Sequence, residues 1–328
     1  CATLLAKPKF GFLVRLACVK HAASVHSEPG SNSPVLSCFS QSTRQAHLLL
    51  LTHSLVSKEQ GSFVLLREAY CTPFCFLRQE LFSLPSFPRL AGAVGFSDDG
   101  KPVADAKLMW RALAASRRLK PIVIDHCEER SLTEGGQMNE GAVARRLGLR
   151  GWPAAAEEVM VVRDIRLAEE TGARVHIAHL SVKGAVRAVR EAKARGVRAT
   201  AEATPHHLVL TEAALEGLDA NFKMNPPLRG DEDVEALREA LRDGTIDAVV
   251  TDHAPHAPGE KSRPFGEAPF GVVGLETAVS VLLDRLVHKN VISLGRLVEL
   301  CAANPARGLG LEGKGRLSPG ADADLVLL

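Results

Sequence analysis

The sequence predicts an α/β fold, specifically a (β/α)8 barrel of the TIM type that is incomplete at its N-terminal strands. From Ala91 onward, short runs rich in small and β-branched apolar residues alternate with segments of helical periodicity. This alternation is typical of parallel strands whose outer face is covered by helices. Six such strands favour a barrel over an open sheet, and a complete barrel has eight. Only residues 1–90 remain to supply the other two.

The elements follow one another in a regular order along the chain. The apolar runs predict strands over 93–97, 122–126, 175–180, 197–203, 222–225 and 248–253. Helical periodicity between them predicts helices over 103–119, 155–170, 182–194 and 233–242. Met109 and Trp110 lie on the apolar stripe of the first helix, so we expect both in the core.

The overall composition is that of an ordinary folded chain. The 328 residues include 40 Lys and Arg, 38 Asp and Glu and 46% hydrophobic residues, with a formal charge of +2. This excludes a disulfide-stabilised miniprotein and a polyanion-binding tail. No apolar stretch approaches the ~20 residues that a membrane span requires. We therefore expect a cytoplasmic protein that binds neither nucleic acid nor membrane.

Residues 1–90 differ from the rest of the chain. They contain no Asp, five of the seven Cys and eight of the twelve Phe, and nine Lys and Arg against four Glu give them a charge of +5. Residues 91–328 have 31 Lys and Arg against 34 acidic residues, a charge of −3. A shift in composition and charge of this size marks a boundary between two different parts of the chain. We interpret 1–90 as an atypical leader, artefactual or poorly ordered, with an organellar transit peptide as the alternative.

The candidate catalytic and metal-binding residues lie where the predicted strands end. In a barrel the carboxyl ends of the strands meet on one face, which carries the active site. Imidazole and carboxylate groups from several strands are typical of a metal-dependent hydrolase, in which a zinc-type Lewis acid activates water. The strand ends read Asp98-Asp99-Gly100, Asp125-His126-Cys127-Glu128, His176-Ile177-Ala178-His179, Glu202 with Thr204-Pro205-His206-His207, Asn225-Pro226-Pro227 and Thr251-Asp252-His253-Ala254-Pro255-His256.

Several of these residues have simpler interpretations. Carboxylates flank Cys127 and should raise its thiol pKa, so we do not interpret it as a nucleophile. The remaining strand-end histidines are expected to orient neighbours or satisfy backbone groups. We expect Asp98 to cap a turn, and Glu128 and Glu129 to cap or solvate a helix start. Residues 257–269 are typical of a mobile loop, with a lid and a plain surface loop both open. The histidines in question are His176, His206, His207 and His253.

The motifs resemble those of a bacterial class I dihydroorotase of the amidohydrolase superfamily, from about Gly92 to Leu328. They are, in order, Gly95-Phe-Ser-Asp-Asp-Gly100, Asp125-His-Cys-Glu-Glu129, His176-Ile-Ala-His-Leu-Ser181, Glu202-Ala-Thr-Pro-His-His-Leu208, Lys223-Met-Asn-Pro-Pro-Leu-Arg229, Asp252-His-Ala-Pro-His256 and Ala268-Pro-Phe-Gly271. The resemblance implies reversible cyclisation of N-carbamoyl-L-aspartate to L-dihydroorotate in pyrimidine biosynthesis. It also implies a barrel over 91–313, with 314–328 as the start of a truncated β-sandwich return strand.

The resemblance assigns a role to each matching residue. Asp99 corresponds to the carboxylate that bridges two zinc ions, His126 and His179 to ligands of the second zinc, and Asp252 to a ligand of the first zinc and the general base. Substrate binding falls to Asn225, His256, Phe270 and Gly271. Related hydantoinases and allantoinases commonly use a carboxylated lysine at the bridging position, so Asp99 favours dihydroorotase. For the four metal ligands, the alternative interpretation is a satisfied network of buried polar groups.

The family's first strand is not recognisable in this chain. It ends in His-x-His followed by Arg, and no His-x-His occurs in residues 1–90, where 25–30 is the nearest string. We therefore expect one or no zinc ion instead of two, and impaired activity of this chain. The alternatives are a non-catalytic dihydroorotase-like partner of aspartate carbamoyltransferase and another cyclic amidohydrolase, such as an allantoinase or hydantoinase. The expected partners are a small-molecule substrate and either a second copy in a homodimer or aspartate carbamoyltransferase.

Overall fold

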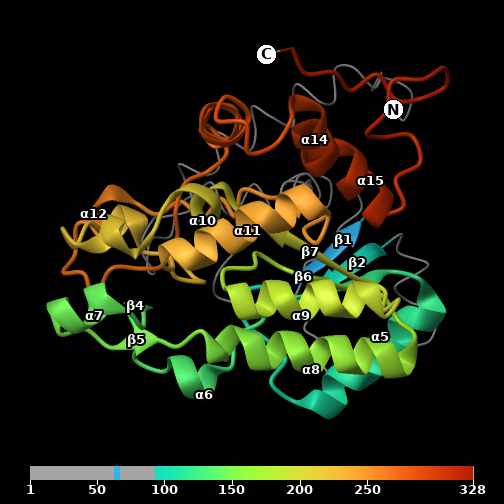
Figure 1. Ribbon diagram of the computed structural model, residues 1–328. Helices are drawn as coiled ribbons and strands as arrows, with labels where there is room; N and C mark the ends of the chain where they lie inside the picture. Colours follow the sequence, from blue (N-terminus) through green and yellow to red (C-terminus); the bar gives the residue numbers. More distant parts are fainter. Residues whose placement is uncertain (1–62, 67–92, 328) are drawn as a thin grey trace, which may run out of the picture.

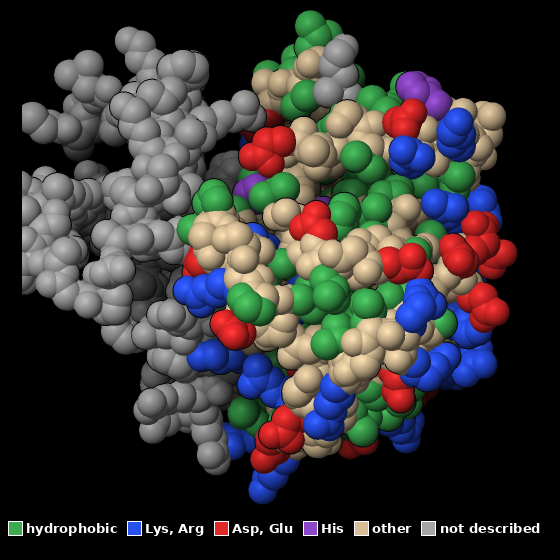
Figure 2. Space-filling view, turned by 90° about the vertical axis from the view of Figure 1, so that its left-hand side faces the viewer, with side chains coloured by type: hydrophobic (Ala, Val, Ile, Leu, Met, Phe, Trp, Pro, Cys, Tyr) green, Lys and Arg blue, Asp and Glu red, His purple; other side chains and the backbone are tan. Residues whose placement is uncertain are grey.

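The computed structural model describes residues 63–66 and 93–327. Apart from residues 63–66, the leader lies outside the described residues, as does the 25–30 string. None of the helices in the described ranges is long and apolar enough to cross a membrane. On the face drawn in Figure 2, Lys and Arg side chains of the described chain interleave with Asp and Glu side chains.

A six-stranded sheet organises the molecule. Its strand order is β1-β2-β3-β6-β7-β8, formed by Phe63–Leu66, Ala93–Ser97, Ile122–Asp125, Val175–Ile177, Ala199–Ala203 and Ala248–Val249. All neighbours from β2 to β8 pair in parallel, whereas β1 pairs antiparallel with β2. The part of the leader that the structure describes therefore adds an antiparallel edge strand and not a barrel strand, because barrel strands of this type are all parallel. A separate parallel pair joins β4 (Met138–Asn139) to β5 (Gly151–Trp152).

Long helices cover the outer face of the parallel strands (Figure 1). They are α5 (Ala106–Leu119), α8 (Ala155–Thr171), α9 (Lys183–Ala194) and α11 (Asp231–Asp243), and each packs against the next in this order. Asp105 caps α5 by accepting a hydrogen bond from the Leu108 amide. Gly172 and Gly244 end α8 and α11 in the left-handed conformation, which glycine adopts without steric cost. The helices bury one apolar face each, and that face forms the core with the strands.

Shorter elements complete the described chain. They are α6 (Arg130–Thr133), α7 (Ala142–Leu147), α10 (Pro205–Val209), the 3-10 turns η3 (Glu212–Leu215) and η4 (Ala220–Phe222), α12 (Pro258–Lys261), α13 (Ala278–Leu282), α14 (Leu294–Val298), α15 (Asn304–Gly308) and the π-helical stretches η5 (Leu283–Val287) and η6 (Glu299–Ala303).

The two faces of the parallel strands have different surroundings. Val123, Val175 and Ala201 point outward into the core beneath the helices. The alternating inward positions, such as Ile124 and His176, line a cavity of about 830 Å³ on the other face. This one-sided cover is the arrangement of an incomplete TIM-type barrel.

The structure confirms most of the predicted elements and corrects three expectations. The strand expected at 222–225 is the end of η4 followed by irregular chain, because the amides of Phe222 and Lys223 donate to the carbonyls of residues 219 and 220 within the turn and are not available to a ladder. Trp110 is 41% exposed and lies outside the core, because its Nε1 donates to Glu170 on α8, whereas Met109 is fully buried as expected. Residues 314–327 contain no strand, so the expected return strand is not confirmed.

Candidate metal centre

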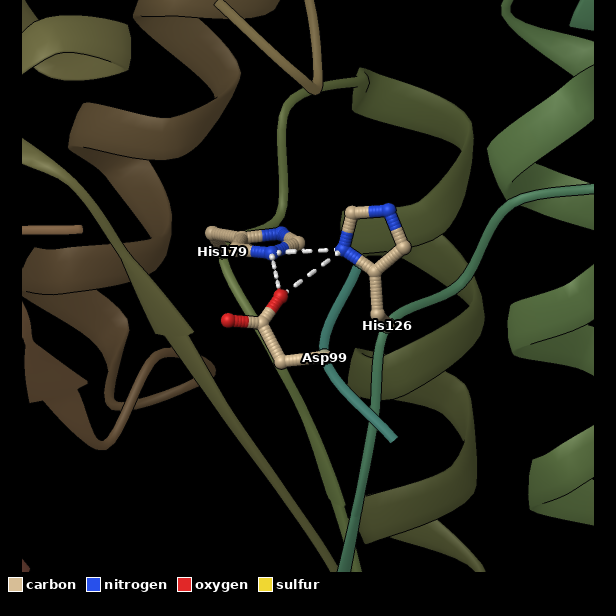
Figure 3. A group of neighbouring side chains, drawn as sticks. All are labelled: Asp99, His126 and His179. Carbon is tan, nitrogen blue, oxygen red and sulfur yellow. Dashed lines mark hydrogen bonds and ion pairs between the residues drawn. The ribbon is translucent and has the colours of Figure 1, made fainter. Parts of the chain in front are cut away.

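Three side chains from the ends of three neighbouring strands meet at one point (Figure 3). Asp99 follows β2, His126 follows β3 and His179 follows β6. His126 Nδ1 and His179 Nε2 are 2.8 Å apart, and Asp99 Oδ1 lies 3.4 Å from the first and 3.6 Å from the second. One ligand atom from each residue thus faces a common centre, with all three atoms within 4.8 Å of one another.

Asp98 fixes the strand ends that carry two of these residues. Its buried carboxylate accepts the amide of His126 at 2.8 Å through Oδ1 and the amide of Val103 at 2.7 Å through Oδ2. Asp98 does cap the turn after its strand, as expected, through the Val103 bond. In addition it ties the end of β2 to the end of β3, so Asp99 and His126 are held at a fixed separation.

Glu128 has a role that the sequence did not predict. It was expected at a helix start, yet Glu129 is the residue that caps α6, by accepting from the Ser131 amide. His126 Nε2–H donates to Glu128 Oε2 at 3.1 Å, and Asn225 Nδ2 donates to the same oxygen at 3.0 Å. Glu128 lies two residues after His126, and on an extended chain such a spacing puts both side chains on the same side. This spacing was the signal in the sequence that could have revealed the contact. A carboxylate behind an imidazole is the usual support of a metal-binding histidine, because it fixes the tautomer and the ring orientation.

The charges of the centre follow from these contacts. Burial raises the pKa of Asp99, but hydrogen bonds from His126 and His179 outweigh it and hold this pKa well below its usual range. Burial also raises the pKa of Glu128, yet bonds from His126, Thr133 and Asn225 lower it to about 2. Against the effect of its own burial, the two carboxylates raise the pKa of His126 to about 10. The centre therefore stabilises positive charge between two anions.

The backbone is strained at two of the predicted site residues. His179 has φ 29° and Asp252 has φ 43°, both in the left-handed region, which costs a non-glycine residue roughly 1–3 kcal/mol. Strained backbone conformations cluster at functional sites, where the surrounding structure holds a residue in the conformation that orients its side chain. Asp252, His179 and Asp99 line the same cavity, so the structure brings all three to one space.

Of the predicted substrate-binding residues, Asn225 is tied to the centre, whereas His256 and the Phe270–Gly271 backbone are tied to each other and to Lys223. Asn225 is linked to His126 through Glu128. His256 Nε2–H donates to the Phe270 carbonyl at 2.8 Å, and the Gly271 amide donates to the Lys223 carbonyl at 2.8 Å. The loop between them is packed, since Phe265 and Ala268 are buried in a small apolar cluster.

The four other strand-end histidines make hydrogen bonds within the fold, as expected. His207 Nε2–H donates to the Pro226 carbonyl, and burial lowers the pKa of His207 to about 3. His206 Nε2–H donates to the Thr251 carbonyl, and His253 Nδ1 accepts the amides of residues 274 and 275. His176 lies between Thr200 and Glu202. None of the four belongs to the metal-compatible clusters of the described chain.

A second buried cluster lies behind the first. Asp125 Oδ2 accepts from the thiol of Cys127 at 3.0 Å, and Asp164 lies 3.8 Å from the same sulfur. Burial and the neighbouring carboxylates raise the pKa of Cys127 well above its usual value, so the thiol stays protonated. The interpretation of Cys127 as chemically inert is therefore consistent with its surroundings.

The residues of the first cluster fit a divalent metal ion. Two imidazole nitrogens and a carboxylate oxygen form a donor set that zinc accepts, and three protein ligands suffice for a catalytic site. The chain thus has a candidate metal centre at Asp99, His126 and His179.

The chain is similar to known dihydroorotases. A protein-family model described as Dihydro-orotase-like matches residues 79–185. A dihydroorotase from Pelotomaculum thermopropionicum is 57% identical over 238 residues, which are 73% of this chain and 56% of the relative. A dihydroorotase from Bacillus caldolyticus is 48% identical over the same shares of the two chains.

The chain spans slightly more than half the length of these curated relatives. Among solved structures, it is similar to the L-hydantoinase (dihydropyrimidinase) of Arthrobacter aurescens, with a TM-score of 0.66 and 26% identity over 74% of this chain and 56% of the other. A dihydropyrimidinase from Brevibacillus agri has a TM-score of 0.59 and 28% identity, over 67% of this chain and 50% of that one. These likenesses agree with an incomplete amidohydrolase barrel.

Proposed function

We propose that this chain is the barrel of a dihydroorotase, which opens the ring of L-dihydroorotate to N-carbamoyl-L-aspartate and closes it again in pyrimidine biosynthesis. The observation that carries the proposal is the Asp99, His126 and His179 centre with Glu128 behind it. It occurs in a chain that is 57% identical to a dihydroorotase over 238 residues.

Zinc is the proposed metal, held by Asp99, His126 and His179, with Asp252 as a further ligand where a second ion binds. When bound, zinc polarises the ring carbonyl and activates water near neutral pH. The donor set of two imidazoles and a carboxylate supports zinc over magnesium or calcium, which prefer oxygen ligands throughout.

Asp252 is the proposed general base. Ring opening adds water across the amide bond: the oxygen joins the carbonyl carbon, the carbon–nitrogen bond breaks and the nitrogen gains a proton. The Asp252 carboxylate takes that proton from water and delivers it to the leaving nitrogen, and ring closure reverses the transfer. Its place in the same cavity as Asp99 and His179 supports this role.

Substrate binding is proposed for Asn225, His256 and the Phe270–Gly271 backbone. Asn225 has its amide nitrogen bonded to Glu128, which leaves the amide oxygen for a substrate N–H. His256 and the Phe270–Gly271 backbone are joined by one hydrogen bond, which ties the two proposed substrate-binding elements to each other.

The test is ring opening of L-dihydroorotate by the purified chain with zinc. We expect slow turnover, absent in Asp252→Asn and unchanged in Asp284→Asn, whose carboxylate is exposed on η5. A chimera that carries the N-terminal strands of the Pelotomaculum relative should restore full turnover. If hydantoin or allantoin were opened faster than dihydroorotate, another cyclic amidohydrolase would replace this proposal. No turnover by the chimera would contradict it.

The remaining assignments are also proposals. We propose domain limits at 1–90, 91–313 and 314–328, a cytoplasmic location, and assembly as a homodimer or with aspartate carbamoyltransferase. Sedimentation of the chain alone and with aspartate carbamoyltransferase distinguishes the two assemblies. A chain that binds zinc and the transferase but never opens dihydroorotate, even as the chimera, would be a structural partner and not an enzyme.

A further inference from the structure

The Lys223 ammonium group is buried at the junction of three segments. The residue is 1% exposed and is among the largest fully buried side chains of the described residues. Its Nζ donates to Gln137 Oε1 at 2.6 Å, to the Phe265 carbonyl at 2.6 Å and to the Ala268 carbonyl at 2.8 Å. All three protons of the ammonium group thus have acceptors, two of them on the loop before Gly271.

Two aromatic rings enclose the same group. Nζ lies 4.9 Å from the ring centre of Phe265 and 4.5 Å from that of Phe270, within the range of cation–π attraction. The Phe270 ring stacks on Trp152 of β5, with centres 5.3 Å apart. The cation therefore links the loop both through its carbonyls and through its side chains.

The loop that Lys223 holds leads directly into the proposed substrate-binding backbone. Besides the bonds of its ammonium group, the Lys223 carbonyl accepts the Gly271 amide. Lys261 provides a second brace, because its Nζ donates to the carbonyls of Ala220 and Pro269. The chain from Phe265 to Gly271 is thus attached to one lysine at both of its ends.

The hydrogen-bond acceptors around position 223 require a side chain that can donate, such as lysine. The carbonyls of Phe265 and Ala268 point at a buried position, and an apolar side chain would leave them without a donor. Burial lowers the pKa of Lys223 to about 8, which leaves the group charged at neutral pH. Lys223 is also two residues before Asn225, so one short segment carries both a substrate ligand and the support of the loop.

We propose that Lys223 is a positioning residue that holds the loop 265–271, and with it the Phe270–Gly271 backbone, in its substrate-binding conformation. The proposal rests on the proposed function for the identity of the substrate. It does not place Lys223 in contact with substrate or metal.

The test compares Lys223→Met, which keeps the length of the side chain and removes its donors, with Lys289→Met at an exposed lysine. In hydrogen–deuterium exchange of the intact chain, Lys223→Met should speed exchange of the 265–271 amides at least tenfold and leave β6 and β7 unchanged. Zinc affinity should stay within twofold. KM for dihydroorotate should rise about tenfold, with kcat within threefold, and Lys223→Arg should recover part of the loss.

Several outcomes would overturn the proposal. Unchanged exchange of 265–271 in Lys223→Met would show that Lys223 does not hold the loop. Faster exchange with KM unchanged, or with kcat reduced in its place, would show that the loop does not position substrate. If Lys223→Met fails to fold, Lys223→Gln, which is shorter but keeps a donor, is measured in its place, and unchanged exchange of 265–271 in that variant counts against the proposal. Exchange is measured without substrate, so its result is independent of whether the chain is a dihydroorotase.

Discussion

Replacement of Arg229 by Met should be among the most damaging single changes in the described chain. The guanidinium is 3% exposed, and it donates to Ser181 Oγ at 3.0 Å, to Asn139 Oδ1 at 3.0 Å and to the Trp152 carbonyl at 2.9 Å. It also lies 3.8 Å from the buried carboxylate of Glu157. Ser181 is two residues after His179, so this network anchors the chain that leaves the metal centre.

The expected loss follows from what the substitution leaves behind. Removal of one partner of a buried ion pair costs about 3–5 kcal/mol, because the other charge stays buried without compensation. Burial raises the pKa of Glu157, so protonation in the variant relieves part of the penalty and moves the expected value toward the lower end. The Asn139 and Trp152 acceptors also lose a donor, at roughly 1–3 kcal/mol for each that stays unsatisfied. We expect a loss of about 3 kcal/mol or more.

The assay is urea unfolding at pH 7, with the free energy of unfolding taken from the midpoint and the slope. The matched control is Arg190→Met, because Arg190 forms an exposed pair with Asp243 on the same sheet-covering layer and should lose less than ~1 kcal/mol. Glu157→Gln in the Arg229→Met background should recover part of the stability. A loss in Arg229→Met no larger than that in Arg190→Met would refute the reasoning.

Three further predictions concern the centre and its surroundings. Glu128→Gln should lower the pKa of His126 in the metal-free chain by about one pH unit or more, measured by NMR titration, whereas Glu129→Gln should not. The pKa of Lys223 falls from 10.5 to about 8 on burial, so between these values the unfolded chain holds the proton that the native chain has lost, and the free energy of unfolding rises with pH. This increment, at most ~3 kcal/mol, should be absent from urea titrations of Lys223→Met. Asp252→Asn should abolish ring opening yet retain most bound zinc by metal analysis, and loss of the metal would show that Asp252 acts mainly as a ligand.

The sequence correctly predicted the helices and strands that are recognisable from the pattern of apolar residues within a single segment. Apolar runs and helical periodicity located the parallel strands and the long helices, because each strand buries one face under a helix. The ends of β2, β3 and β6 then had to converge, so Asp99, His126 and His179 were accessible to sequence reasoning. Lys223 was not, since its role depends on partners 42 and 86 residues away in the chain. Glu128 was missed although His126, which it supports, lies only two residues before it. The expected strand at 222–225 was wrong because apolar character was counted and the turn that Asp219 caps just before it was not.

The candidate metal ligands and the proposed substrate-binding backbone are held in place by different parts of the fold. The candidate metal ligands stand on strand ends joined by the buried carboxylate of Asp98. The proposed substrate backbone at Phe270–Gly271 stands on a loop joined to the barrel by the ammonium group of Lys223. Mutations that reshape the loop can therefore accumulate without disturbing the ligands. For the proposed dihydroorotase, this means that the cyclic amide it accepts can change while the proposed metal ligands are inherited intact.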